Sequence, residues 1–342
     1  MPETQQILLA SGIALSSACI IYAILSPSSA FRRWLTNSQR PWVKVGKVSA
    51  LYIYPIKGCK ANSISTAKCA LWGMQAGEVK DRHFMLINAE KGDKVDAQQE
   101  SRMSLIQSDI DDNILFINAP DMPEFRLDFS SFVSAENLRR VTVETNGREV
   151  EGYDCGEEVG QWLGKFLNTT YPIRLLYFVA GLRNDVPRYL KEKWTGFIPN
   201  RSEKLAYASK SPYLLMCQES VDDLLSNHIC SGKRITDQNF RGNITVSGTK
   251  PYDEDNWLEI RIGEAEMTYL RPCTRCLQTT IDTATGEKDK QFEPLSSLRK
   301  YRVLQNEDDR KSLGSNPVLG CLLGLDKEGD IEVGCDVYVK YR

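Results

Sequence analysis

The chain has 342 residues, enough for one large domain or two modest domains with their own cores. With 42% hydrophobic and 26% charged residues it has the composition of an ordinary globular protein. A net charge of −2 excludes the strongly basic surface that nucleic-acid-binding proteins use, so we expect no nucleic-acid partner. The ten cysteines are scattered, which fits buried, reduced thiols in a cytosol-like compartment, although an even count also permits disulfides.

Residues 1–30 are predicted to form a transmembrane signal anchor. No charged residue occurs from Thr4 to Phe31, and residues 7–25 are predominantly apolar, a length that nearly spans a bilayer core of roughly 30 Å. A cleaved signal peptide is the alternative, with small residues near Ser28 that could be a cleavage site. The segment before the apolar run carries Glu3 and no Lys or Arg, however, and this favours the uncleaved anchor.

A linker is predicted over residues 31–44, and it is rich in positive charge. Arg32, Arg33, Arg40 and Lys44 follow the apolar run, so the positive-inside bias predicts that the rest of the chain stays in the cytosol. The anchor is only moderately hydrophobic, and together with its basic flank it is compatible with a single pass through the mitochondrial outer membrane. Another membrane with the same orientation is the alternative.

Residues 45–178 are predicted to be rich in short strands separated by Gly, Asn, Asp and Pro. The expected strands cover residues 48–56, 84–88, 114–118, 125–129 and 141–145. One helix interrupts them, from Glu157 to Leu167. Its apolar residues recur with helical spacing on one face, and Asn168 is a suitable C-cap.

Residues 187–341 are predicted to form a second region of the same kind. A short helix is expected from Val221 to Ile229, with Ser220 ahead of it as the first residue of an acidic capping box. The expected strands cover residues 213–217, 244–247, 257–262, 267–270, 277–282, 331–333 and 337–340. Many short strands and few helices indicate an α+β, β-rich chain of two domains with a barrel-like or sandwich architecture.

Two cysteines in the segment from Tyr269 to Glu287 are the strongest chemical signal. Arg275 separates Cys273 from Cys276, and a fixed positive charge favours the thiolate form of a neighbouring cysteine. A thiolate is a soft metal ligand as well as a redox group. Structural zinc is one alternative, but there is no second C-x-x-C and the chain has only two histidines. A thioredoxin-like dithiol is another, although it requires a helix that starts at the first cysteine.

This segment resembles the cysteine motif of the MOSC-domain family, which is related to the C-terminal part of molybdenum-cofactor sulfurase. The pattern R-C-x-x-T-T-x-D-x-x-T-G falls on seven positions, which are Arg275, Cys276, Thr279, Thr280, Asp282, Thr285 and Gly286. The resemblance implies that Cys276, and not Cys273, is the metal and catalytic residue. It also implies that residues 45–178 form the β-rich MOSC N-terminal domain and residues 187–341 the MOSC domain.

The resemblance further implies a binding site for the molybdenum cofactor, a molybdenum–molybdopterin that carries a dithiolene and a phosphate. Arginine and lysine suit the phosphate, and backbone amides or hydroxyl groups suit the pterin. The residues at the corresponding motif positions are Lys57, Gly58, Arg82, Lys210, Ser211, Arg241, Asn243, Thr274 and Arg275. Taken alone, an arginine beside an aspartate, as at Asp81-Arg82, is more often a structural pair.

The activity implied by the resemblance is the reduction of N-oxygenated compounds such as amidoximes, hydroxamic acids and N-hydroxylated amines, with nitrite as a further candidate. No flavin or nicotinamide fingerprint is present. We therefore expect electrons to come from partner proteins, and the resemblance implies that these are cytochrome b5 and its NADH-dependent reductase, cytochrome b5 reductase. The alternative is a non-redox carrier of the cofactor or of sulfur as a persulfide on Cys276. The sulfurase relatives carry in addition a pyridoxal-phosphate domain, which this sequence does not contain.

The sequence departs from the family pattern at several positions near these motifs. Gly58 stands where the family usually has a serine, and Ser209 and Lys250 stand where close relatives carry acids. A changed charge beside the substrate pocket is expected to alter the range of substrates without preventing cofactor binding.

Overall fold

The structure is a computed structural model, and it describes residues 39–130, 139–145, 147–184, 201–229 and 233–342. The predicted anchor at residues 1–30 and most of the predicted linker lie outside these residues. Within the described ranges, no helix is both long enough and apolar enough to cross a membrane.

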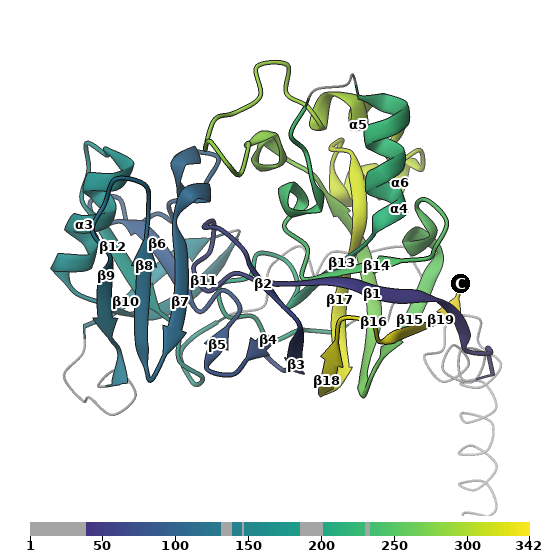
Figure 1. Ribbon diagram of the computed structural model, residues 1–342, viewed down its shortest axis with the longest axis horizontal. Helices are drawn as coiled ribbons and strands as arrows, with labels where there is room; N and C mark the ends of the chain where they lie inside the picture. Colours follow the sequence, from purple (N-terminus) through teal and green to yellow (C-terminus); the bar gives the residue numbers. More distant parts are fainter. Residues whose placement is uncertain (1–38, 131–138, 146, 185–200, 230–232) are drawn as a thin grey trace, which may run out of the picture.

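Seven strands form a closed β-barrel (Figure 1). They are β1 (Val43–Ile53), β13 (Tyr213–Cys217), β14 (Ile244–Ser247), β15 (Trp257–Ile262), β16 (Ala265–Thr274), β17 (Val318–Lys327) and β19 (Asp336–Tyr341). Their order is β14-β13-β17-β16-β15-β19-β1, and the pairing of β1 with β14 closes the ring. Closure leaves no free edge among these strands, and the barrel interior is filled by buried side chains such as Trp257, Tyr213 and Tyr269.

Strand β1 joins the barrel although nearly the whole β-rich first half of the chain follows it in sequence. It pairs with β19, where Val43 lies opposite Val339, and with β14 on its other side. At Gly46 a Cβ atom would lie 2.1 Å from the carbonyl oxygen of Ser247, so only glycine permits this close crossing. The first strand is therefore part of the same barrel as the strands of the second half, and the division of the chain near residues 178–187 stays a prediction.

The remaining strands form three small sheets beside the barrel. Their bounds are β2 (Asn62–Ile64), β3 (Thr66–Ala70), β4 (Gly73–Ala76), β5 (Val79–Lys80), β6 (Phe84–Asn88), β7 (Gln107–Asp111), β8 (Ile114–Asn118), β9 (Phe125–Asp128), β10 (Arg140–Thr145), β11 (Arg148–Asp154), β12 (Ile173–Tyr177) and β18 (Gly329–Glu332). The sheets have the orders β10-β11-β12-β6, β18-β3-β4-β5 and β7-β8-β9, while β2 pairs with β1. Figure 1 shows β7 to β12 on the side away from the barrel.

Helix α3 (Glu157–Leu167) has the predicted bounds and ends at Asn168 in the left-handed conformation. It packs against β12 at very short range, because a Cβ atom at Gly160 would lie 2.2 Å from the carbonyl oxygen of Ile173. Its apolar face, with Trp162 and Phe166, enters the same core as Phe84 of β6. This core holds the three-stranded sheet β7-β8-β9 and the sheet containing β6 together.

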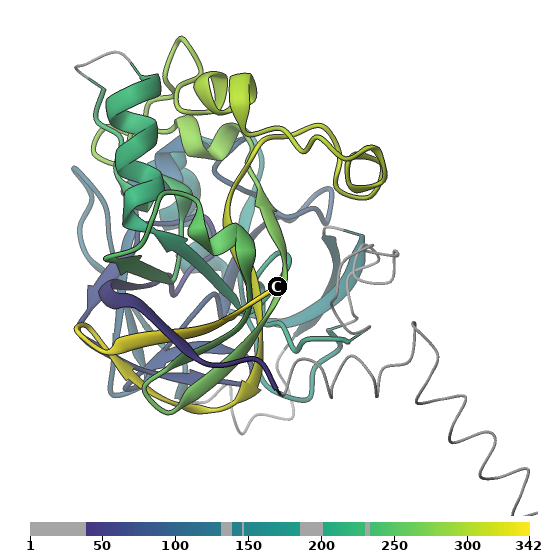
Figure 2. The same cartoon turned by 90° about the vertical axis from the view of Figure 1, so that its right-hand side faces the viewer.

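The short helices of the second half gather at one end of the barrel, as Figure 2 shows. They are α4 (Gln218–Asp223), a π-helical turn η4 (Leu224–His228), α5 (Leu295–Tyr301), α6 (Glu307–Leu313) and the 3-10 turns η5 (Asp237–Phe240), η6 (Asp253–Asn256) and η7 (Leu277–Thr280). A further 3-10 turn, η1 (Ser101–Leu105), lies in the first half of the chain.

The predicted capping box at Ser220 is wrong. The helix begins at Gln218 rather than Val221, so Ser220 lies within its first turn. The Ser220 hydroxyl lies 2.9 and 3.0 Å from the two carboxyl oxygens of Glu254, which is fully buried, and it accepts a hydrogen bond from the backbone N–H of Tyr252. The need to provide a donor for a buried carboxyl therefore decides the role of this serine.

The predicted strand at residues 277–282 is also wrong, because this segment forms the 3-10 turn η7. The Thr279 and Thr280 hydroxyls donate to the carbonyl oxygens of Cys276 and Leu277, three residues earlier. Such local side-chain bonds offer the backbone an alternative to a strand and outweigh the β-propensity of threonine. The predicted bounds of β6, β8, β13, β14 and β15 agree with the structure.

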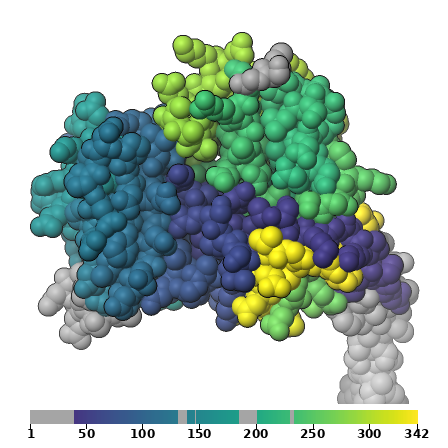
Figure 3. Space-filling view, viewed as in Figure 1, coloured from purple at the N-terminus to yellow at the C-terminus, as the bar shows by residue number. Residues whose placement is uncertain are grey.

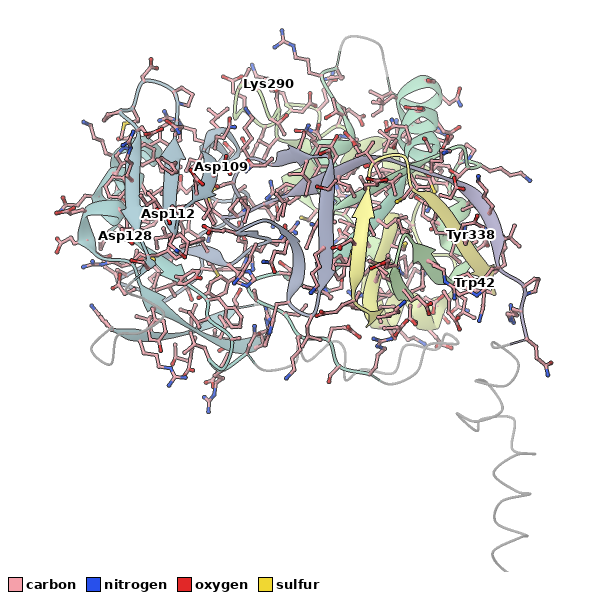
Figure 4. All side chains as sticks on the ribbon, turned by 60° about the horizontal axis from the view of Figure 1, so that its bottom comes forward. Trp42, Asp109, Asp112, Asp128, Lys290 and Tyr338 are labelled. Carbon is pink, nitrogen blue, oxygen red and sulfur yellow. The ribbon has the colours of Figure 1, made fainter. Side chains whose placement is uncertain are left out.

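Exposed aspartates occur at one end of the molecule and exposed or partly exposed aromatic side chains at the other (Figure 4). Asp109 and Asp128 are exposed on β7 and β9, and Asp112 is exposed in the turn between β7 and β8. Trp42 and Tyr338 lie on the outer wall of the barrel. The loops that contain the predicted site residues lie between these two ends.

Candidate functional site

The ten predicted site residues all line one pocket, with a volume of about 330 Å³, between the barrel and the first-half sheets. They are Lys57, Gly58, Arg82, Lys210, Ser211, Arg241, Asn243, Thr274, Arg275 and Cys276. In the space-filling view the surface is hollowed where the blue first half meets the green second half (Figure 3). The motifs therefore converge in space although they are spread over more than half of the sequence.

Lys57 places its ammonium group in this pocket, where no described residue accepts a hydrogen bond from it. The residue follows the end of β1 and its side chain is only 8% exposed. Its Nζ atom has no hydrogen-bond partner among the residues that the structure describes. Burial, followed by the positive charges of Arg148 and Lys94, lowers the pKa of the Lys57 ammonium well below its ordinary value. An unpaired buried cation is costly, so this position is suited to a bound anion.

Arg82 and Arg241 both contact the ring of Tyr54. Their guanidinium carbons lie 4.5 Å and 4.3 Å from the centre of the Tyr54 ring. Arg82 also pairs with the buried carboxylate of Asp81, so it is a structural pair as well as a residue of the pocket. Both arginines have a positive φ, 52° and 57°, which is uncommon for a residue with a side chain.

Arg241 is partly exposed, but its Nη2 atom is buried and remains unused. Nη1 donates to the carbonyl oxygen of Cys59 at 2.8 Å, while Nη2 has no partner within the described part of the chain. Burial lowers the pKa of Arg241, and the ring of Tyr54 opposes that change. Arg241 thus provides a second donor for an anion in the same pocket as Lys57.

Asn243 and Ser211 hold the pocket wall together. The Asn243 amide oxygen accepts from Arg82 and from the backbone N–H of Leu214, both at 3.4 Å, and its amide nitrogen donates to the carbonyl oxygen of Tyr52. The Ser211 hydroxyl donates to the carbonyl oxygen of Tyr213 at 2.6 Å. These side chains connect β1 and β13 with the residues that carry charge, and a role for either in cofactor binding stays a prediction.

Cys276 lies just beyond the end of β16, partly exposed, with its side chain in the pocket. Cys273 lies within β16, is buried, and belongs to an apolar cluster with Leu214 and Leu322. No disulfide joins the eight cysteines in the described ranges. The greater exposure of Cys276 makes its sulfur the more accessible of the two to a ligand in the pocket.

Arg275 supports the segment that carries Cys276. Its Nε and Nη1 atoms donate to the carbonyl oxygens of Leu319 and Phe240 at 2.9 and 2.6 Å. Gly320 has a φ of +70°, and a Cβ atom there would lie 2.7 Å from the carbonyl oxygen of Leu215 and 3.2 Å from Nη2 of Arg275, so glycine permits the close packing beside the guanidinium. With these donors used inside the protein, the clearest role of Arg275 is to fix the backbone before Cys276; contact with a cofactor stays a prediction.

Lys210 lies at the same end of the pocket as the two thiols. Its Nζ atom donates to the Thr274 hydroxyl oxygen at 2.8 Å. Burial, followed by the positive charge of Arg271, lowers the pKa of Lys210, and the thiols of Cys273 and Cys276 oppose that change. Thr274 is thereby tied to Lys210, two residues before Cys276.

The pocket contains residues that the sequence motifs did not reveal. Lys94 and Asp96 form an ion pair on its wall, and Asn239, Phe240 and Asn316 also line it. None of these lies at a motif position, so no sequence signal distinguished them from surface residues. Ser209 lines the pocket as expected, whereas Lys250 is not among the lining residues.

The donor set fits an anionic ligand whose metal needs one protein sulfur. Six lining side chains are cationic, and Asp96 is the single acidic one. Elsewhere in the described ranges too, no group of three or more His, Cys, Asp and Glu could hold a metal ion alone. The unsatisfied Lys57 and Arg241 atoms suit a phosphate, and Cys276 suits a soft metal whose remaining ligands belong to a cofactor.

Comparisons with known proteins place the chain in a family. Residues 45–170 match the model of the MOSC N-terminal beta barrel domain, and residues 202–338 match that of the MOSC domain. Mitochondrial amidoxime-reducing component 1 of Mus musculus is 35% identical over 93% of this chain and 89% of its own length. The Homo sapiens protein of the same name is 36% identical over 90% and 87%. Mitochondrial amidoxime reducing component 2 of Homo sapiens is 33% identical over 92% and 90%.

Proposed function

Because this chain belongs to the MOSC-domain family that includes the mitochondrial amidoxime-reducing components, we propose that it is a molybdenum-cofactor oxidoreductase that reduces N-oxygenated compounds. The observation that carries the proposal is the placement of two unsatisfied buried cationic atoms, Lys57 Nζ and Arg241 Nη2, in one pocket with Cys276. A phosphate and a soft metal on a single small cofactor would satisfy all three.

The residues of this chain have distinct tasks in the proposed enzyme. Lys57 and Arg241 would hold the phosphate, and Arg82 is fixed beside Arg241 by Asp81 and Tyr54. Cys276 would be the protein ligand of the metal, in a position fixed by the bonds of Arg275 to Leu319 and Phe240. Leu214 and Leu322 form an apolar wall beside the thiols, which limits the access of water.

The bound cofactor would supply the two-electron chemistry that the side chains cannot perform. In the overall reaction the N–O bond of the substrate breaks, and two electrons and two protons convert the oxygen to water. Amidoximes would give amidines, and N-hydroxylated amines would give amines. Hydroxamic acids and nitrite are further candidate substrates.

Electron supply, location and topology complete the proposal. We propose NADH, cytochrome b5 reductase and cytochrome b5 as the source of electrons. The names of the relatives support a mitochondrial location, and the apolar run at residues 7–25 with the positive charges after it supports an anchor in the outer membrane with the barrel facing the cytosol.

Metal analysis and a turnover assay test the proposed function together. Purified protein should contain close to one molybdenum per chain and should reduce benzamidoxime to benzamidine when reduced methyl viologen supplies the electrons. Bound molybdenum without reduction of any N-oxygenated compound would favour the cofactor-carrier alternative. Protein that binds no molybdopterin would contradict both.

A further inference from the structure

The charged residues of the pocket divide into two groups. The charges that act on the pKa of Lys57 are those of Arg148, Lys94, Asp96 and Arg82. Arg241 belongs to the same group, because the charge of Arg82 acts on its pKa too. The pKa of Lys210 instead depends on Arg271, Arg275 and the thiols of Cys273 and Cys276. The first group contains the two unsatisfied cationic atoms, while the second surrounds the sulfur proposed to hold the metal.

The group around Lys210 borders an apolar wall. Leu214, Leu322 and Cys273 pack together in one cluster and line the pocket beside it. Asp96, the single acidic residue of the pocket lining, forms its ion pair with Lys94 and acts on Lys57 rather than on Lys210. The reacting end of the pocket therefore combines an apolar surface with a net positive charge.

We propose that Lys210 makes this enzyme selective for N-oxygenated substrates that carry an acidic group, such as a carboxylate, on an apolar body. This inference rests on the proposed function. The Lys210 ammonium lies 2.8 Å from the Thr274 hydroxyl oxygen, on the segment that leads to Cys276, so it is fixed close to the reacting end. An anion bound there gains a charge-assisted hydrogen bond in a partly buried site, where such bonds are strong.

A neutral and an acidic substrate of the same shape reveal this selectivity. Benzamidoxime and 4-carboxybenzamidoxime react alike: each takes two electrons from reduced methyl viologen and two protons from water. The N–O bond breaks, the oxygen leaves as water and an amidine forms. For the wild-type protein we expect a larger kcat/KM for the acidic compound, mainly through a lower KM.

Two substitutions at position 210 separate charge from shape. Lys210→Met keeps the length of the side chain and removes its charge, so it should lower the ratio of the two kcat/KM values about tenfold to a hundredfold. Lys210→Arg should keep most of the preference. Ser209→Asp, which places an acid beside Lys210, should lower the ratio without altering Lys210 itself. Lys290, exposed on a loop outside this pocket, provides Lys290→Met as the control for the loss of one charge (Figure 4).

The outcomes distinguish the inference from the function on which it rests. If wild-type protein reduces both compounds and Lys210→Met leaves their ratio unchanged, the substrate inference is wrong and the proposed function stands. If Lys210→Met loses its molybdopterin, Lys210 is a cofactor ligand and the inference is also wrong. If wild-type protein contains the cofactor and reduces neither compound, the proposed function fails and the inference fails with it.

Discussion

The guanidinium of Arg82 donates a hydrogen bond of 3.1 Å to the backbone carbonyl oxygen of Arg241, from the opposite half of the sequence. The same two side chains stack on Tyr54, whose hydroxyl donates to the carbonyl oxygen of Gly242 at 3.1 Å. The contact joins the loop between β5 and β6 to the turn before β14. Arg82 thus holds the backbone from which Arg241 reaches the pocket, and loss of Arg82 should also weaken the position of Arg241.

The two cysteines of the pocket should respond differently to substitution. Cys276→Ser replaces a soft ligand by a hydroxyl and should abolish N-reduction, while much of the cofactor stays bound through Lys57 and Arg241. Cys273→Ser should keep most of the activity, because Cys273 packs into the apolar wall. Turnover and molybdopterin content of the two purified variants provide the measurement. An essential Cys273 with a dispensable Cys276 would reverse the assignment, and loss of activity in both would favour a dithiol.

Lys57 should favour cofactor binding at the expense of the stability of the empty protein. Lys57→Met removes a buried cation without a partner, so the free energy of unfolding of the cofactor-free protein should rise by about 1–3 kcal/mol. The same variant should bind much less molybdopterin. Urea denaturation of cofactor-free protein and pterin analysis measure the two effects, with Lys290→Met as control. A fall in stability would show that the Lys57 ammonium is satisfied in the empty protein.

Glu254 should make stability depend on pH. Burial, followed by the charge of Asp255, raises the pKa of the Glu254 carboxyl from 4.5 to about 7. The folded state therefore favours the protonated form, so this contribution to stability is complete below pH 4.5 and is lost as pH rises to about 7.

Glu254→Gln cannot ionise and should remove that dependence. Between pH 4.5 and pH 8, the free energy of unfolding of the variant should rise relative to that of wild type by on the order of 3 kcal/mol. Denaturation curves at both pH values measure the difference, and Glu264→Gln, on an exposed glutamate, is the control. A difference between variant and wild type that is the same at both pH values would count against the buried, protonated carboxyl.

The proposed need for partner proteins rests on the missing flavin and nicotinamide motifs. With NADH alone, the purified protein should not reduce benzamidoxime, and it should gain activity only when cytochrome b5 and its reductase are both present. Spectrophotometric oxidation of NADH measures this directly. Consumption of NADH by the isolated chain with substrate would refute the need for partners.

The anchor can be tested by removing residues 1–38, which keeps Arg40 and its hydrogen bond to the carbonyl oxygen of Tyr341. The shortened protein should leave the membrane fraction, bind the cofactor and reduce benzamidoxime at the same rate with a chemical donor. Fractionation and turnover compare it with the full chain. Failure of the shortened protein to fold would mean that the removed segment is part of the core.

Local patterns predicted the parts of the fold that local interactions decide. The spacing of Trp162 and Phe166 gave the correct bounds for α3, because one apolar face facing one core needs no other information. Residues 277–280 were misread because threonine hydroxyls bond to backbone carbonyls within the turn, and propensity does not register such bonds. Strand β17 was missed, although it lies between β13 and β16 in the barrel.

The site was more predictable than the architecture around it. Lys57, Arg82, Arg241 and Cys276 stand in recognisable motifs, and the structure brings them to one pocket. The hydrogen bond of Lys210 to Thr274 depends on a contact between distant segments, so no motif reveals it. The ion pair of Lys94 with Asp96 joins near neighbours in sequence, but its place on the pocket wall depends on the fold. For the same reason the pairing of β1 with β14 and β19 could not be read from the sequence.

The place of β1 between β14 and β19 has a consequence for synthesis of the protein on the ribosome. The strand emerges early, yet both of its barrel partners emerge much later, and β19 is the last strand of the chain. The sheets that contain β6 to β12 have their partners close by in sequence and can fold while the rest of the chain is still being made. During that time the only partner of β1 that is close in sequence is the short strand β2, which pairs with residues 51–53. The rest of β1 remains unpaired, which is the state in which strands aggregate or recruit chaperones. The barrel cannot close, and the pocket cannot form, until β19 has left the exit tunnel.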